Sequence, residues 1–257
     1  MSNAHIEIRD LTMAYGNFVI QRDLNFDVNR GDIFVIMGGS GCGKSTLLKH
    51  MLGLIVPSTG DILYNGESFV NASTTLQGEM RQRWGITYQS GGLFSAMTLA
   101  ENIALPLQLY TNYSTAEVAD ILAYKLALVG LAGYQEYYPS EISGGMRKRA
   151  ALARAIALDP EILFFDEPSA GLDPISSRLL DELIVEMQES LGATVVMVTH
   201  ELPSIFDIAT NSVYLDANSR TMIAYGNPKH LRDHSDQPVV RQFLARGIAS
   251  EEENNNE

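Results

Sequence analysis

The chain has 257 residues, of which 46% are hydrophobic, enough to bury the core of one large domain or of a domain with a subdomain. Its formal net charge of −13 argues against a surface that binds nucleic acid. The single cysteine, Cys42, excludes an internal disulfide, and no cluster of Cys and His residues indicates structural zinc.

Alternating polar and apolar residues, separated by Gly, Asn and Asp turns, predict strands in the first 70 residues. These predicted strands cover 5–11, 25–29, 31–38 and 60–66. The run that follows Gly43, over 46–54, predicts a helix instead. This part of the chain is therefore expected to be rich in strands.

From about residue 98 to 158 the hydrophobic pattern has the period of a helix, and Gly130 and Gly133 end the helix predicted over 114–131. Apolar runs without alternation, at 161–165 and 194–199, flank an amphipathic helix and indicate buried parallel strands of an α/β sheet. That helix is predicted over 174–192, and a hairpin is predicted over 211–226.

Both ends of the chain are polar. The start, MSNAHIEIRD, lacks the apolar region of a signal peptide, and the apolar runs elsewhere are shorter than the about 18 to 20 residues of a membrane span. We therefore expect a cytoplasmic chain that acts at a membrane only if another polypeptide holds it there. The acidic segment 250–257 has no apolar side chain, and we expect it to be disordered.

The loop GGSGCGKST follows a predicted strand and precedes a predicted helix, and it matches the pattern G-x-x-x-x-G-K-[ST]. Its glycines let backbone N–H groups surround phosphate oxygens, and the helix dipole adds to the attraction. Lys44 can reach the β- and γ-phosphates, and the Ser45 hydroxyl can hold Mg²⁺. A glycine-rich turn with a chance lysine does not account for the full pattern. The residues expected to bind nucleotide here are Gly38, Gly39, Ser40, Gly41, Cys42, Gly43, Lys44, Ser45 and Thr46.

Asp166 and Glu167 follow the predicted strand over 161–165, and His200 ends the next one. Ligands of open α/β sheets bind beyond the carboxyl ends of the strands, so these side chains are expected at the same edge as the phosphate loop. Asp166 fits a Mg²⁺ partner that acts through water, and Glu167 fits the base that orients the attacking water. A lone histidine is more often structural, but three strand ends at one crevice favour contact between His200 and the γ-phosphate.

Two further candidates are weaker when judged from the residues alone. Gln89 ends the short run GITYQ and could bind Mg²⁺ and respond to the γ-phosphate, although a solvated loop glutamine fits the pattern better. Tyr15 precedes a turn and could stack on a nucleotide base, and a core tyrosine fits the pattern about as well.

The segment ISGGMRKRAALARA predicts a helix that is capped by Ser143. Its first turns carry the basic residues Arg147, Lys148 and Arg149, although the helix dipole is already positive at that end. We therefore expect either an anion in front of this helix or a solvated basic face against acidic neighbours.

Seven motifs together resemble the nucleotide-binding subunits of ATP-binding-cassette (ABC) transporters, over nearly the whole chain. In chain order they are the A-loop Tyr15, the Walker A motif GGSGCGKS, the Q-loop Gln89, the signature SGGMR, the Walker B motif ILFFDE, the D-loop SAGLDP and the switch His200. The resemblance implies an α/β fold, a P-loop NTPase of the ABC-ATPase type, with a RecA-like core and an antiparallel β subdomain. It also implies a single domain over 1–249, with a helical subdomain at about 93–160.

The resemblance implies ATP and Mg²⁺ as cofactors and a head-to-tail dimer with ATP at its interface. The implied catalytic residues are Glu167, His200 and Lys44, and the implied Mg²⁺ ligands are Ser45, Gln89 and Asp166. Ser143, Gly144 and Gly145 of one copy would face the γ-phosphate that the other copy holds. ATP binding would close the dimer, and hydrolysis would reopen it. A permease helix would dock near Gln89 and the segment after Leu93.

Longer blocks such as QSGGLF and SGGMRKRAALARAIALDPEI resemble ATPases of the Mla (maintenance of lipid asymmetry) type. Those work with a permease and a mammalian-cell-entry (MCE) domain protein to move phospholipids between Gram-negative membranes. This resemblance implies a peripheral protein on the cytoplasmic side of the inner membrane, with a small regulatory subunit as a further candidate partner. The signature departs from the family's usual LSGGQ at Ile142 and Met146, which leaves its backbone amides intact.

Three alternatives compete with this interpretation. An ATPase of another importer, such as one for polar amino acids, shares blocks like AGLDP and VTHEL. A soluble ABC protein that remodels ribosomes or DNA without a permease is disfavoured by the acidic composition and the single cassette. A nucleotide-binding scaffold without turnover is disfavoured because Glu167 and His200 are both present.

Overall fold

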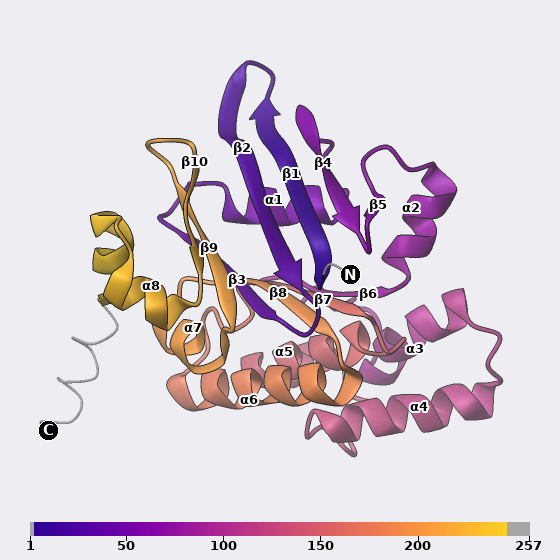
Figure 1. The fold of residues 1–257 in the computed structure, drawn as a ribbon. Coiled ribbons are helices and arrows are strands. Elements are labelled where there is room, and N and C mark those ends of the chain that lie inside the picture. Colours follow the sequence, from indigo (N-terminus) through magenta and orange to yellow (C-terminus); the bar gives the residue numbers. More distant parts are fainter. Residues whose placement is uncertain (1–2, 246–257) are drawn as a thin grey trace, which may run out of the picture. The chain divides into compact units, whose positions relative to one another are not determined.

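The computed structural model describes residues 3–245 (Figure 1). The expected acidic tail over 250–257 lies outside this range. The fold is mixed α/β, as expected, and its contacts divide the chain into two compact units. Of the described residues, the first unit contains 3–77 and 196–245, and the second contains 78–195. Within 3–245, no helix combines the length and the apolar character that crossing a membrane requires.

The first unit contains a four-stranded antiparallel sheet in the order β2-β1-β4-β5 (Figure 1). Its strands are β1 (Ala4–Tyr15), β2 (Phe18–Asn29), β4 (Thr59–Tyr64) and β5 (Glu67–Ser68). β1 and β2 are longer than predicted because the turn at Gly16, with φ of 55°, pairs Tyr15 with Phe18 and lets the ladder start at once. Apolar side chains such as Ile6 and Ile8 are fully buried.

A second set of strands in the first unit carries the phosphate loop. β3 (Ile33–Gly38) pairs in parallel with β9 (Asn211–Asp216), which forms the predicted hairpin with β10 (Thr221–Gly226). Every residue of β3 is buried, which agrees with the uninterrupted apolar run in its sequence. The helices of this unit include α1 (Lys44–Met51), α7 (Leu202–Ile208) and α8 (Pro228–His234), and residues 238–245 are helical as well. α1 begins two residues before the predicted start, and α7 and α8 were not predicted.

The second unit joins two parallel strands to a group of helices. β6 (Trp84–Thr87) pairs with β7 (Ile162–Asp166), and the rings of Trp84 and Phe164 meet edge to face at 5.5 Å. The helices are α3 (Leu99–Tyr110), α4 (Thr115–Leu128), the 3₁₀ turn η1 (Pro139–Glu141), α5 (Gly144–Ala155) and α6 (Pro174–Leu191). α3, α4 and α5 pack on one another, and α5 also packs on α6 (Figure 1).

The helices begin where the sequence offers caps. Thr98 with Glu101 and Ser114 with Glu117 form capping boxes at α3 and α4, and Asp173 caps α6. Two elements contain the boundaries between the units: α2 (Thr74–Arg81) and β8 (Thr194–Val198). The parallel strands, the hairpin and the helical segment predicted from the sequence are thus present.

Candidate active site

The phosphate loop joins the buried strand β3 to α1 in the first unit. Gly38 ends the strand with φ of 145°, and a Cβ atom there would lie 2.3 Å from the Leu215 carbonyl oxygen. Gly41 and Gly43 have φ of 76° and 103°. Side chains disfavour these conformations, which is why glycine recurs in the pattern. Successive N–H groups in such a turn form a concave site for an anion.

Lys44 places its charge within this loop. Its Nζ donates hydrogen bonds to the carbonyl oxygens of Gly38, at 2.9 Å, and Gly39, at 3.1 Å. The first turn of α1 carries no acidic residue, so no carboxylate there competes with a bound anion for the N-terminus of the helix. Ser45 and Thr46 lie half-buried in the same turn. The loop therefore combines an ammonium group, a helix N-terminus and two hydroxyls.

A buried glutamine supports the loop from β2. Gln21 Nε2 donates to the carbonyl oxygen of Cys42 at 2.7 Å and to that of Asp216 at 3.0 Å. Cys42 is itself buried, and this burial raises the pKa of its thiol. The Cys42 side chain thus fills space beneath the loop as a neutral thiol.

The other two site residues of the first unit are exposed. Tyr15 is the last residue of β1, and 55% of it is exposed, so it is not a core tyrosine. His200 lies two residues beyond the end of β8, rather than within a strand as expected. Its imidazole is 58% exposed, and its Nε2 lies 3.7 Å from a Glu201 carboxylate oxygen.

In the second unit the two acids lie at the end of β7, as expected. Asp166 is the last residue of the strand, and Glu167 follows with φ of 50°. This left-handed conformation is uncommon for a residue with a side chain, and such strain is concentrated at functional sites. The Glu167 carbonyl oxygen accepts hydrogen bonds from Ala170 N and from Lys148 Nζ, each at 3.3 Å. Both acids are half-buried.

Gln89 lies in a loop of the second unit, two residues beyond the end of β6, and not within the strand as expected. Its side chain is exposed, while its carbonyl oxygen accepts a hydrogen bond from Lys148 Nζ at 2.7 Å. The carbonyl oxygen of Gly92 accepts one from Arg154 at 2.8 Å. Two cations of α5 therefore hold the main chain of this loop.

The signature segment begins α5. Ser143 is its N-cap, as predicted, and its Oγ accepts a hydrogen bond from Met146 N at 3.2 Å. Gly144 and Gly145 are the first helical residues, whose N–H groups have no acceptor within the helix.

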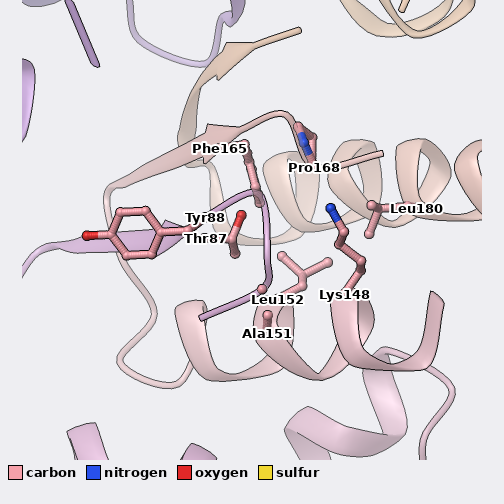
Figure 2. Close-up of a pocket in the computed structure, with 9 residues that line it drawn as sticks. Thr87, Tyr88, Lys148, Ala151, Leu152, Phe165, Pro168 and Leu180 are labelled. Atoms are coloured by element: carbon pink, nitrogen blue, oxygen red, sulfur yellow. The ribbon is translucent and has the colours of Figure 1, made fainter. Parts of the chain in front are cut away.

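The three basic residues at the start of α5 all donate hydrogen bonds to main-chain carbonyl oxygens. Arg147 donates to the Ile142 carbonyl oxygen at 2.8 Å and Arg149 to that of Val129 at 2.7 Å, while Lys148 bonds to the carbonyl oxygens described above. Figure 2 shows Lys148 extending from α5 toward the loop that contains Pro168. Main-chain carbonyls thus accept hydrogen bonds from all three side chains, and the negative charge of Glu167 also favours the charged form of Lys148.

The comparisons with known proteins agree with the motifs. The model of the ABC transporter family matches residues 21–170. This chain belongs to the ABC transporter family.

Two curated relatives extend the match beyond the family model. The probable ribonucleotide transport ATP-binding protein mkl of Mycobacterium leprae is 41% identical over 93% of this ABC transporter chain and 68% of its own length. The intermembrane phospholipid transport system ATP-binding protein MlaF of Escherichia coli K12 is 41% identical over 95% of this chain and 89% of its own length. The chain thus spans about two thirds of the length of the mycobacterial relatives.

A solved structure shares the fold. The dimeric post-hydrolysis state of the ATP-binding cassette MJ0796, bound to ADP and Pi, has a TM-score of 0.78 and 26% identity, covering 86% of this chain and 98% of that one. The family match and these relatives confirm the predicted P-loop NTPase fold of the ABC-ATPase type. They also identify the chain as an ATPase that binds ATP.

Two residues that contact the loops described above, Gln21 and Arg154, were not predicted for this ABC transporter chain, and Lys148 was singled out only as one of three basic residues. Gln21 supports the phosphate loop, and Lys148 and Arg154 hold the loop of Gln89. Lys148 and Arg154 lie on the signature helix six residues apart, but nothing in that spacing points to the loop that they contact. Gln21 carries no motif signal either.

Proposed function

We propose that this ATPase powers a transporter that moves phospholipids between membranes. The observation that carries the proposal is the similarity to the E. coli intermembrane phospholipid transport ATP-binding protein MlaF, which extends over 244 residues and 89% of that protein. The mycobacterial relative named for ribonucleotide transport is as similar, but a third of its length has no counterpart in this chain.

The proposed catalytic unit is a single domain over 1–249, with a helical subdomain at about 93–160 and an acidic tail over 250–257. Glu167 acts as the base toward the attacking water, and the strained φ of 50° supports a functional role for it. Lys44 neutralises phosphate charge, and His200, whose imidazole is exposed, contacts the γ-phosphate. Exposed Tyr15 stacks on the base of ATP.

The donor set fits Mg²⁺, which prefers oxygen ligands and is bound by few carboxylates together with phosphates. Ser45, Gln89 and Asp166 offer a hydroxyl, an amide and a carboxylate oxygen. Among residues 3–245 no three His, Cys, Asp or Glu side chains form a cluster that could hold a metal by themselves. When bound, the ion would help to neutralise the phosphates, while this chain's residues position ATP and the water.

The proposed active form is a head-to-tail dimer. In each copy Ser143 Oγ accepts from Met146 N, so its own O–H group can donate to a phosphate oxygen of the facing copy. The N–H groups of Gly144 and Gly145 begin a helix and suit the same anion. The solved structure of the related cassette MJ0796 is dimeric.

A permease cytoplasmic helix is proposed to dock in a groove of the second unit, of about 700 Å³. The groove is lined by residues of β6, the loop after it and α3, and the exposed side chains of Phe94, Leu109 and Tyr110 give it an apolar, aromatic surface. Such docking would hold the chain at the cytoplasmic side of the inner membrane. An MCE-domain protein and a small regulatory subunit are the other proposed partners.

Co-purification tests this assignment. The chain is tagged at its C-terminus and purified from detergent-solubilised membranes of its own cells. A permease and an MCE-domain protein are expected to co-purify with it. A charged substitution in the groove, Leu109→Glu, is expected to lose both partners, whereas Lys229→Glu on α8 keeps them. Recovery with a permease and a soluble solute-binding protein would contradict the phospholipid assignment and favour another importer.

A further inference from the structure

Lys148 links two loops of the second unit through one ammonium group. Its Nζ donates to the main-chain carbonyl of Gln89 at 2.7 Å and to that of Glu167 at 3.3 Å. Lys148 itself lies five residues after Ser143 on the signature helix α5. Three motifs that are far apart in the sequence therefore meet at this one side chain.

The surroundings of Lys148 shield its ammonium group partly from solvent. Lys148 is half-buried, and this burial lowers its pKa, while the negative charge of Glu167 raises it by a smaller amount. Beside it lies a cavity of about 10 Å³, lined by Thr87, Leu152 and Phe165 among others (Figure 2). This volume holds one water molecule at most. Of the two hydrogen bonds, the one to Gln89 is exposed to solvent and the one to Glu167 is part-buried.

The position of this link matters because the Glu167 peptide is strained. Glu167 has φ of 50°, and its carbonyl oxygen accepts hydrogen bonds from Lys148 Nζ and from Ala170 N. A conformation that side chains disfavour persists only when its surroundings hold it. Lys148 supplies one of these restraints from outside the loop, and it supplies the same restraint to Gln89.

We propose that Lys148 is a positioning residue for ATP hydrolysis, because it ties the main chain of Glu167 to that of Gln89. When the Gln89 loop shifts, the Gln89 carbonyl oxygen, which forms the shorter of the two hydrogen bonds, draws the Lys148 ammonium with it. The hydrogen bond from this ammonium to the Glu167 carbonyl then changes as well. The carboxylate is then held for catalysis only when the Gln89 loop is in place. This inference rests on the proposed roles of Glu167 as base and of Gln89 at the γ-phosphate.

The test is steady-state ATP hydrolysis by Lys148→Met, which keeps the length of the side chain and removes all three donors. The kcat is expected to fall at least about tenfold, because the loss of one hydrogen bond to a charged donor corresponds to a factor of about that size. The KM for ATP is expected to change less than about twofold, since Lys148 does not touch the nucleotide. Lys148→Arg, which retains donors, should keep at least about a third of the wild-type kcat.

Lys229→Met is the matched control, because Lys229 is an exposed lysine of α8 outside the proposed machinery, and it should hydrolyse ATP as the wild type does. A wild-type kcat in Lys148→Met would overturn the inference. So would a loss that appears only in KM, or a Lys148→Arg variant as slow as Lys148→Met. If Lys148→Met does not fold, Lys148→Leu, which also lacks donors, replaces it, with the same expected split between kcat and KM.

Glu167→Gln separates this inference from the function on which it rests. If Glu167→Gln is inactive and Lys148→Met is as fast as wild type, only the role of Lys148 is wrong. If Glu167→Gln itself hydrolyses ATP at the wild-type rate, the proposed base is wrong instead.

Discussion

The phosphate loop requires a residue without a side chain at Gly38, and Gly38→Ala measures that requirement. A Cβ atom there would lie 2.3 Å from the Leu215 carbonyl oxygen and 2.7 Å from Cys42 Sγ. The φ of 145° adds backbone strain of about 1 to 3 kcal/mol, and the overpacking adds about 1 to 3 kcal/mol. The expected destabilisation is therefore about 4 kcal/mol, or a melting temperature lower by about 8 to 16 °C for a chain of this size.

Calorimetric melting without nucleotide provides the measurement, and Gly39→Ala is its control. Gly39 is the next residue of the same loop, but a Cβ atom there meets nothing within 4 Å. Its substitution is expected to lower the melting temperature by less than about 2 °C. If the two variants melt at the same temperature, the close contacts and the backbone conformation at Gly38 do not lower the free energy of unfolding, and the prediction is wrong.

Two predictions concern buried charges. Lys125, whose side chain is 4% exposed, forms an ion pair with the exposed Asp159. Asp159→Asn leaves the buried ammonium without its partner, whereas Lys125→Met removes the buried charge, so Asp159→Asn should lower the melting temperature more. A larger decrease for Lys125→Met would contradict this prediction. Burial lowers the pKa of His50, so the unfolded chain binds more protons and stability falls as the pH drops below about 6.5. His50→Asn keeps a donor for the Ile55 carbonyl but does not titrate in this range, so its free energy of unfolding should not show the decrease caused by His50. If the difference in the free energy of unfolding between wild type and variant stays the same from about pH 8 to about pH 5.5, the prediction is wrong.

The phosphate loop was predictable because its pattern encodes main-chain conformation directly. Gly38, Gly41 and Gly43 all have the left-handed φ values that explain why glycine recurs there. Gln89 and His200 were placed less well, since each lies two residues beyond its strand. An apolar run indicates that a strand exists, but its last hydrogen bond depends on the neighbouring strand, which the run does not reveal.

The contacts of the basic residues could not be predicted from three adjacent letters. Successive residues of a helix point about 100° apart, so Arg147, Lys148 and Arg149 reach carbonyls of four different segments. Gln21 was missed for a related reason. In β2 every second residue from Leu24 onward is buried, and the same alternation continued backwards would point Gln21 toward solvent. An irregularity near Asp23, with φ of 53°, shifts this alternation and turns Gln21 inward.

The role of Glu167 as the base can be measured by single-turnover and steady-state ATP hydrolysis of Glu167→Gln. The variant is expected to bind ATP as tightly as wild type but to hydrolyse it at least about 100-fold more slowly, because a general base contributes about that factor. Glu186→Gln, at an exposed glutamate of α6, is expected to hydrolyse ATP normally. If Glu167→Gln hydrolyses ATP at the rate of Glu186→Gln, Glu167 is not the base.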